Sequence, residues 1–118
     1  MMMDINFEDQ VRDFQKVVGG DQEPFLYRAL IVEEVEEFNE AILRRFPEEA
    51  QLKELVDIVY VAIGYAVSKG WDFTTAFNLV HYNNMGRMRQ DDGTILRRED
   101  GKVIKNPNYP KVNLGGCV

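Results

Sequence analysis

Apolar residues in the first half of the chain recur at the spacing of α-helices and predict two amphipathic helices there. The first is expected over about residues 5 to 18 and ends at Gly19-Gly20, because glycine is common just past a helix end. Its apolar positions are Phe7, Val11, Phe14, Val17 and Val18. The second is expected to begin near Asp21 and Pro24, a good N-cap and a proline tolerated in the first turn. It ends before RRFP, and its apolar stripe is Ile31, Val35, Phe38 and Ile42.

Two further helices are predicted by the middle of the chain. The third starts around Pro47 and runs to Lys69, where a cation and then Gly70 make a C-terminal signal. It contains KELVDIVYVAIGYAV (53–67), in which two acids are followed by ten residues without charge, so the helix is apolar on nearly every side. Asp72 caps a fourth helix that reaches about Arg89. Its apolar positions are Phe73, Ala76, Phe77, Val80 and Met85.

The last part of the chain predicts a hairpin and an irregular tail. In TILRREDGKVIK (94–105), Asp100-Gly101 separates two β-prone arms, which is a strong hairpin signal. Four helices with short connections predict an all-α fold, an antiparallel four-helix bundle followed by a short C-terminal β-hairpin and tail. The 118 residues fit a single domain, with a helical core over about 5–90 and a basic hairpin and tail over about 91–118.

Charge is distributed unevenly along the chain. The formal net charge is −6, with a balance of −9 over residues 1–86 and +3 over residues 87–118. An acidic body argues against a general nucleic-acid binder, and we expect no nucleic acid polymer as a partner. This asymmetry would suit a site in which acidic residues bind metal ions and the basic tail binds phosphates. The alternative is a solvated tail whose charges do nothing specific.

Cysteine content and the N-terminal sequence narrow the class of protein further. Cys117 is the single cysteine, which excludes an intrachain disulfide and a cysteine-ligated zinc site. The N-terminal stretch MMMDINFEDQ carries acids where a secretory signal needs cations, and no apolar run reaches membrane-spanning length. We therefore expect a cytoplasmic protein without a membrane partner.

The second predicted helix carries five glutamates, of which three are candidates for a site. Like charges one turn apart each cost roughly 0.2–0.5 kcal/mol, so a crowded acidic helix needs a compensating partner. Glu40 has Arg44 one turn on, and Glu36 lies away from the apolar stripe, so both are expected to be solvated. Glu34 falls roughly 60° from the centre of the stripe at about 100° per residue, with Glu37 and then Glu33 further round.

The third predicted helix carries acids that can complete the site. Glu54 and Asp57 share a face, and although Lys53 can pair with Asp57, no cation on the helix pairs with Glu54. An unpaired carboxylate near a core costs several kcal/mol unless it is protonated, hydrogen-bonded or metal-bound. If the two helices are antiparallel neighbours, their acids converge in a site of hard oxygen ligands for Mg²⁺ or Mn²⁺. The alternative is an ordinary solvated acidic face.

These motifs resemble those of a known family. EEVEE (33–37) followed by ELVD (54–57) is similar to the ExxE and ExxD metal motifs of the MazG-like, all-α nucleoside triphosphate pyrophosphohydrolases. The resemblance continues in order through VRDFQ (11–15), YRALIVEE (27–34), HYNNMGRM (81–88) and DGKVIKNPNYP (100–110). It looks specifically like the small branch of phosphoribosyl-ATP pyrophosphohydrolase-like proteins, which is related to the dimeric dUTPases.

The resemblance implies roles for particular residues. The implied metal ligands are Glu34, Glu37, Glu54 and Asp57, and Glu33 is the implied catalytic residue, close enough to help hold a metal or activate water. The implied substrate-binding residues are Gln15, Asn84, Arg87, Lys102, Lys105 and Tyr109, the last three in a segment that closes over the nucleotide. Gln15 stands where the family's VRxFH motif has His, which leaves open which nucleotide base the protein prefers. Arg87 stands where Lys is usual, which keeps the charge.

The implied activity is a Mg²⁺-dependent hydrolysis, with Mn²⁺ as a substitute, that cleaves the α–β bond of a nucleoside triphosphate into the monophosphate and pyrophosphate. A homodimer or a dimer of dimers is expected, because a third helix that is apolar nearly all round needs more cover than thin neighbours give. Two alternatives stay open. One is a phosphoribosyl-ATP pyrophosphohydrolase of histidine biosynthesis, and the other is a noncatalytic acidic helical module that binds a partner.

Overall fold

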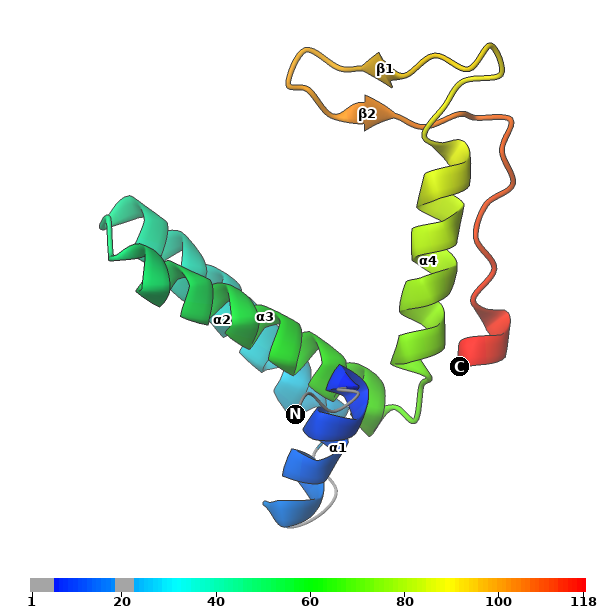
Figure 1. The fold of residues 1–118 in the computed structure, drawn as a ribbon. Coiled ribbons are helices and arrows are strands. Elements are labelled where there is room, and N and C mark those ends of the chain that lie inside the picture. Colours follow the sequence, from blue (N-terminus) through cyan, green and yellow to red (C-terminus); the bar gives the residue numbers. More distant parts are fainter. Residues whose placement is uncertain (1–5, 19–22) are drawn as a thin grey trace, which may run out of the picture. The chain divides into compact units, whose positions relative to one another are not determined.

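The computed structural model describes residues 6–18 and 23–118, shown as a ribbon in Figure 1. The chain divides into two compact units, one up to Phe73 and one from Thr74 onward, and each is described by itself. We call them the first unit and the second unit. A single domain over residues 1–118 stays a prediction. Among the described residues, none of the helices has the length and apolar character needed to cross a bilayer.

The first unit contains three helices whose bounds agree closely with the sequence pattern: α1 (Phe7–Val17), α2 (Pro24–Leu43) and α3 (Glu48–Ser68). The Asn6 side chain caps α1 by accepting a hydrogen bond from the Asp9 amide at 3.1 Å. The N-cap of α2 is Glu23, and Pro24 occupies the first turn as predicted. The predicted signals at Asp21 and at Gly19-Gly20 lie outside the described residues.

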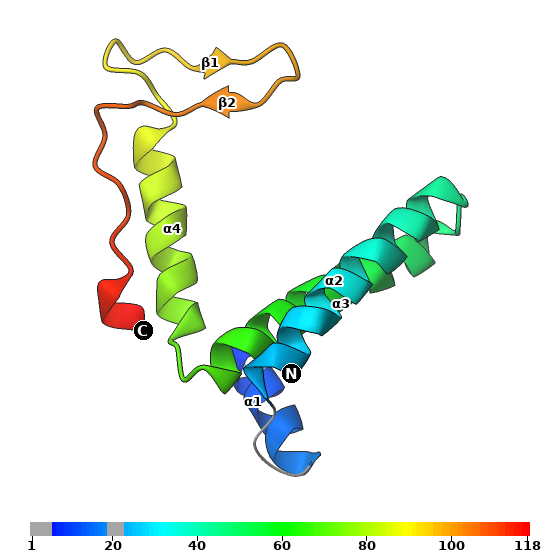
Figure 2. The same cartoon turned by 180° about the vertical axis from the view of Figure 1, so that it is seen from behind.

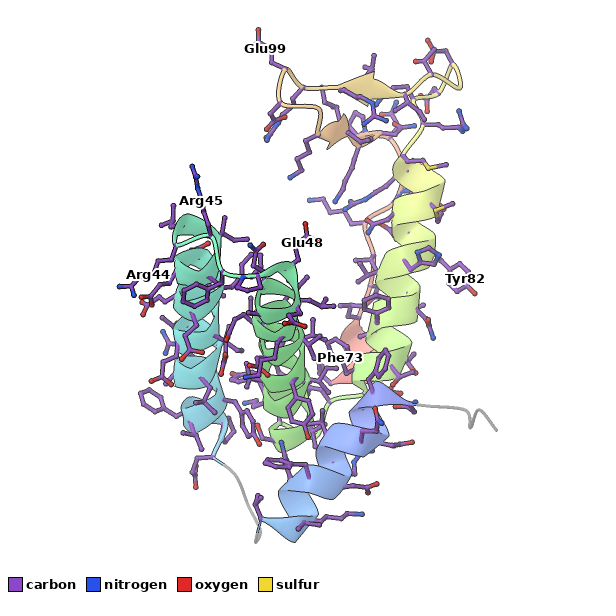
Figure 3. All side chains as sticks on the ribbon, turned by 60° about the vertical axis from the view of Figure 1, so that its left-hand side comes forward. Arg44, Arg45, Glu48, Phe73, Tyr82 and Glu99 are labelled. Carbon is purple, nitrogen blue, oxygen red and sulfur yellow. The ribbon has the colours of Figure 1, made fainter. Side chains whose placement is uncertain are left out.

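Helices α2 and α3 run side by side in opposite directions, as both views of the ribbon show (Figures 1 and 2). The tight turn that joins them is marked by Arg44, Arg45 and Glu48 in Figure 3. Arg45 has a φ of 55°, and the Phe46 amide donates to the Ala41 carbonyl at 2.9 Å. This closes α2 with a Schellman motif, although the left-handed position holds arginine instead of the usual glycine. The turn therefore sets which residues of α2 face α3.

The same motif ends α3 at the glycine that the sequence singles out. Gly70 has a φ of 75°, a left-handed conformation that glycine adopts without strain. The Trp71 amide donates to the Ala66 carbonyl at 2.9 Å, as the motif requires. The predicted C-terminus of this helix is confirmed.

The buried face of α2 differs from the predicted stripe. Tyr27 and Ala41 are its buried residues, whereas Val35 and Ile42 are 39% and 44% exposed. Tyr27, Glu34 and Ala41 follow one another at intervals of seven residues, which places them on one line along the helix. The prediction that Glu34 falls roughly 60° from the centre of the buried stripe was therefore wrong, because the buried residues Tyr27 and Ala41 place it on the central line.

The second unit contains α4 (Phe73–Arg87) except for its first residue, the strands β1 (Leu96–Arg97) and β2 (Val103–Ile104), and a short 3₁₀ helix, η1 (Gly115–Cys117). The strands pair antiparallel, with Leu96 opposite Ile104. Asp100 and Gly101 form the predicted turn, in which Gly101 has a φ of 90° and Asp100 accepts a hydrogen bond from the Lys102 amide at 3.1 Å. The all-α fold with a C-terminal hairpin is confirmed for the described residues.

Candidate metal centre

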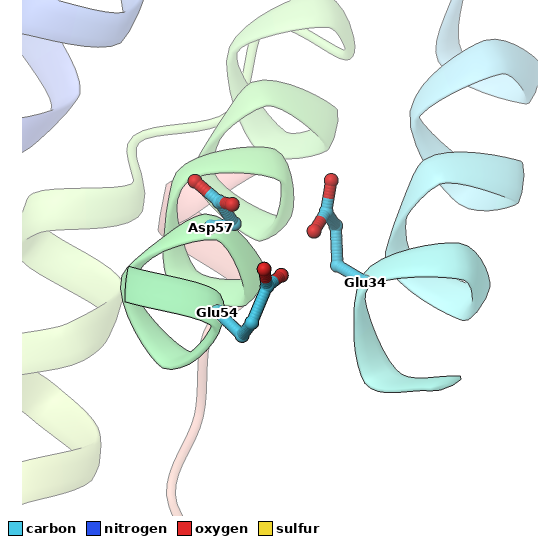
Figure 4. Close-up of side chains that lie close together, drawn as sticks. All are labelled: Glu34, Glu54 and Asp57. Carbon is cyan, nitrogen blue, oxygen red and sulfur yellow. The ribbon is translucent and has the colours of Figure 1, made fainter. Parts of the chain in front are cut away.

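Three carboxylates converge between α2 and α3. Glu34 comes from α2, Glu54 and Asp57 come from α3 one turn apart, and one oxygen from each lies within 4.8 Å of the others. Figure 4 shows the three side chains pointing toward one another. We call this group the carboxylate cluster. The sequence prediction that acids of the second and third helices face each other across one seam is confirmed for these three residues.

The cluster contains buried oxygens that the described protein atoms leave without a partner. All three residues are half-buried, and the Oε2 atoms of Glu34 and Glu54 are buried without a hydrogen bond. Such atoms raise the free energy of the folded state unless a proton or a cation meets them. The donor set consists of carboxylate oxygens, which suits Mg²⁺ or Mn²⁺ better than zinc. The residues present therefore fit a divalent cation.

The crowding of negative charge helps to raise the pKa values of two glutamates of the cluster. Desolvation is the main reason that the pKa of Glu34 is raised to about 7, followed by a hydrogen bond with Glu37 and the charges of Glu37, Asp57 and Glu54. Desolvation also raises the pKa of Glu54, and the neighbouring Glu37 carboxylate raises it further. Glu37 is not one of the three converging residues, but its carboxylate lies near enough to both glutamates to raise their pKa values.

One cation pairs with the cluster among the described ion pairs. Lys53 Nζ lies 2.6 Å from Asp57 Oδ2, which confirms the pairing that the sequence allowed. The hydrogen bond and charge of Asp57 raise the pKa of Lys53. A single exposed lysine offsets one negative charge and leaves the glutamates to be balanced by something else. Glu33, the predicted catalytic residue, is exposed on α2 and is not one of the three converging residues.

Gln15 is buried in the first unit, and its side chain faces the backbone of α3. Its Nε2 donates to the Gly64 carbonyl at 3.0 Å, and the side chain is also hydrogen-bonded to Tyr27. These contacts give Gln15 a structural role that its place in the VRDFQ motif did not reveal. Its contact with substrate stays a prediction.

In the second unit, α4 carries two of the predicted phosphate-binding residues, and a third packs against this helix. Arg87 ends α4, and its Nε is buried without a hydrogen-bond partner. Tyr109 packs over the preceding residue, because a Cβ on Gly86 would overlap the Tyr109 hydroxyl and lie 2.8 Å from Cε2. Asn84 is exposed on the same helix. Sequence reasoning missed the role of Gly86, although a glycine inside a helix is itself a signal because it costs about 1 kcal/mol relative to alanine.

Asn83 is a second residue that sequence reasoning missed in this unit. Its Nδ2 donates to the Pro110 carbonyl at 2.8 Å, and its Oδ1 is buried without a partner. The contact ties the segment that carries Tyr109 back to α4. Lys102 and Lys105 are exposed on and next to the hairpin.

The raised pKa of Glu34 predicts how the metal-free protein responds to pH. Glu34 has an ordinary pKa of 4.5 in the unfolded chain and about 7 in the folded chain, so the folded state holds the proton more tightly. The stabilisation is complete below pH 4.5 and is lost as the pH rises to about 7. Urea unfolding with a chelator present should show this fall relative to Glu34→Gln. Equal pH dependence of the two proteins would contradict the assignment.

Two comparisons place the chain among known proteins. The family model described as phosphoribosyl-ATP pyrophosphohydrolase matches residues 4–84. The match makes the chain an enzyme of the nucleotide pyrophosphohydrolase class. It belongs to the phosphoribosyl-ATP pyrophosphohydrolase family, as the sequence resemblance predicted. No curated protein sequence matches the chain.

A solved structure is similar to the chain over most of its length. It is a MazG-like pyrophosphohydrolase of cyanophage S-2L, bound to dGDP and three catalytic Mn²⁺ ions per active site. The similarity has a TM-score of 0.58 at 20% sequence identity and covers 87% of this chain and 91% of that one. It supports the all-α fold.

Proposed function

We propose that the chain hydrolyses a nucleoside triphosphate between the α and β phosphates in a reaction that depends on Mg²⁺ or Mn²⁺. Water adds its oxygen to phosphorus, the bridging bond breaks, and the monophosphate and pyrophosphate leave. The observation that carries the proposal is the carboxylate cluster with its two buried, unpartnered oxygens, in a chain of this family. The Mn²⁺ ions and dGDP bound to the cyanophage protein support a divalent metal and a nucleotide substrate.

The metal would be held by the carboxylate cluster together with Glu37, whose carboxylate lies close enough to raise the pKa of both Glu34 and Glu54. Bound there, a divalent cation would neutralise phosphate charge and lower the pKa of the attacking water. Glu33 adjoins Glu34 in sequence and is exposed, so its carboxylate is open to take a proton from that water. Lys53 holds Asp57 in place through their ion pair.

The phosphates would be bound by residues of the second unit: Asn84, Arg87, Lys102, Lys105 and Tyr109. The buried, unpartnered Nε of Arg87 supports this assignment, because an arginine donor of this kind is well suited to a phosphate oxygen. Exposed lysines add charge that neutralises the departing pyrophosphate.

Replacing both Lys102 and Lys105 with alanine is expected to raise KM for the triphosphate about tenfold, a loss of about 1.4 kcal/mol. Mn²⁺ affinity should stay the same, since neither lysine belongs to the metal site. Steady-state kinetics and calorimetry measure the two effects separately. Lys111→Ala is the matched control, because Lys111 is another exposed lysine of the tail to which we assign no contact. An equal KM in wild type and the double variant would remove the hairpin lysines from the site.

A second candidate substrate is phosphoribosyl-ATP, which the description of the matching family favours. The test is pyrophosphate release from dUTP, dCTP, dGTP and phosphoribosyl-ATP, assayed side by side with Mg²⁺ and with Mn²⁺. Turnover of one or more deoxynucleotides well above phosphoribosyl-ATP supports the proposal. Turnover of phosphoribosyl-ATP alone selects the second candidate, and pyrophosphate release from none of the four contradicts both.

We also propose that a second copy of the chain covers the apolar side of the first unit. A groove of about 510 Å³ there is lined by side chains of α1 and α3, among them Leu55, Val56 and Val59, which are 45%, 54% and 49% exposed. Apolar surface of this kind marks an interaction site more often than a solvated face.

Sedimentation equilibrium should show a dimer or a dimer of dimers. Val59→Glu should shift the protein to the monomer with its helicity retained, since a buried charge disfavours the interface. Lys111→Ala again serves as the control. A wild-type monomer at all concentrations would contradict the proposed assembly.

A further inference from the structure

We infer that Tyr27 and Gly64 are positioning residues for the metal centre, because their contact sets the separation of α2 and α3 at which Glu34 meets Glu54 and Asp57. The inference rests on the proposed function, since it concerns the same carboxylates. Neither residue touches the cluster, so each acts through the helix that carries it.

The contact between the two residues leaves no space for adjustment. A Cβ added to Gly64 would overlap Cε1 of Tyr27 and lie 2.6 Å from Cδ1 and 3.0 Å from Cζ. The tyrosine ring therefore occupies the place that any side chain at position 64 would need. Tyr27 is only 4% exposed, so the ring has no open solvent to move into. The Tyr27 ring of α2 packs directly on the backbone of α3 at Gly64. The thickness of the ring therefore sets how closely the two helices approach here.

The register of the two helices connects this contact to the cluster. Tyr27 precedes Glu34 by seven residues on α2, and Gly64 follows Asp57 by seven residues on α3. Because the helices are antiparallel, the two pairs lie on one line of the seam, two turns or about 10 Å apart. A helix is stiff over two turns, so a change of spacing at Tyr27 is carried to Glu34 with little loss.

A small residue of α2 lies on the other side of the cluster. Ala41 follows Glu34 by seven residues and is fully buried. Counting seven residues along each antiparallel helix from Glu34 and Asp57, away from Tyr27 and Gly64, brings Ala41 to the level of Ala50. The carboxylates therefore lie between two levels of the seam at which small residues allow close approach.

Gln15 adds a restraint at the same point. Its Nε2 donates to the Gly64 carbonyl at 3.0 Å, and its side chain is hydrogen-bonded to Tyr27. One buried side chain of α1 thus touches both members of the contact. This ties α1 to the level of the seam that sets the spacing.

Metal sites respond strongly to such spacing. Ligand distances must fall within about 0.2 Å of their ideal values, and functional constellations must be held to about 0.5 Å. A methyl group inserted between α2 and α3 moves the helices by more than this. The contact between Tyr27 and Gly64 is thus a determinant of metal affinity, in addition to its contribution to packing.

The test uses calorimetric titration of the full chain with Mn²⁺ and circular dichroism to confirm the fold. Gly64→Ala is expected to lower Mn²⁺ affinity at least tenfold by forcing the ring and α2 outward. Tyr27→Leu is expected to lower it several-fold by removing the spacer, whereas Tyr27→Phe keeps the ring and should bind like wild type. Gly116→Ala is the control for the glycine change, because its added methyl meets no atom within 4 Å.

The double variant Gly64→Ala/Tyr27→Leu separates positioning from general damage. The methyl group fills the space that the shorter side chain leaves, so affinity should recover to within a few-fold of wild type. Two independent packing defects would instead lower it further.

The outcomes distinguish the inference from the function on which it rests. A wild type that does not bind Mn²⁺ removes the proposed metal centre. A wild type that binds, with equal affinity in Gly64→Ala or in Tyr27→Leu, overturns the positioning role alone. If Gly64→Ala does not fold, Tyr27→Leu decides, since equal binding by that variant overturns the inference.

Discussion

Glu34→Gln and Asp57→Asn are each expected to lower kcat for triphosphate hydrolysis by at least about 10²–10³-fold, the loss found when one group that stabilises transition-state charge is removed. Each change deletes a negative oxygen from the carboxylate cluster, in which the ligand atoms lie within 4.8 Å of one another. The initial rate of pyrophosphate release at saturating Mg²⁺ measures the effect.

The fold should survive these changes because the carboxylates oppose one another in the metal-free protein. The glutamine of Glu34→Gln has the same shape without the charge that Glu37, Asp57 and Glu54 repel, so the free energy of unfolding should be equal or higher. Glu36→Gln is the matched control, because Glu36 is an exposed glutamate of the same helix. Loss of helicity in both site variants, or a kcat within a few-fold of wild type, would assign the acids a structural role.

Mn²⁺ or Mg²⁺ is expected to raise the melting temperature of the wild type by roughly ten degrees at a hundredfold excess over Kd. Binding to the folded state alone contributes about 2.7 kcal/mol under these conditions. For a domain of this size, that gain in unfolding free energy corresponds to a rise in melting temperature of roughly ten degrees. A cation bound by Glu34 and Glu54 would replace the water that these carboxylates lose, and their buried, unpartnered Oε2 atoms would be available to hold it.

The double variant Glu54→Gln/Asp57→Asn should lose most of that shift, because both acids of α3 that we propose as metal ligands are neutral in it. Differential scanning calorimetry of the two proteins, with metal and with chelator, gives the comparison. Equal shifts would place the metal elsewhere and leave the two acids without the role argued for them.

Local sequence signals predicted much of the fold. The proline of α2, Gly70 at the end of α3 and Asp100-Gly101 in the hairpin each have a backbone requirement that few residues satisfy. Such requirements act within a few residues, so they can be read without knowing what the segment packs against. Arg45 is the exception, because nothing marks an arginine as the residue that will adopt a positive φ.

The acids of the candidate site could also be predicted, but their positions on the helix could not. The apolar stripe of α2 suggested that Glu34 lies beside the buried face, whereas Tyr27 and Ala41 place it on the central line. Tyrosine and alanine are only weakly hydrophobic, so Tyr27 and Ala41 did not stand out in the apolar pattern. Their burial follows from the partner helix, which has a glycine opposite the tyrosine ring.

Contacts across the fold were beyond the reach of the sequence pattern. Gly64 and Gly86 appear in the sequence as unfavourable residues inside helices, and only the structure shows that Tyr27 and Tyr109 fill the space beside them. Likewise, Gln15 belongs to a motif that the family resemblance connects with substrate, while its buried hydrogen bond goes to a backbone carbonyl. The partners of these residues are distant in sequence.

Phosphorus NMR of a deoxynucleoside triphosphate incubated with the protein and Mg²⁺ tests the central claim most directly. We expect the monophosphate and pyrophosphate in equal amounts, formed at least about 10²-fold more slowly by Asp57→Asn and at the full rate by Glu36→Gln. A diphosphate with orthophosphate, or products formed equally well by Asp57→Asn, would contradict it.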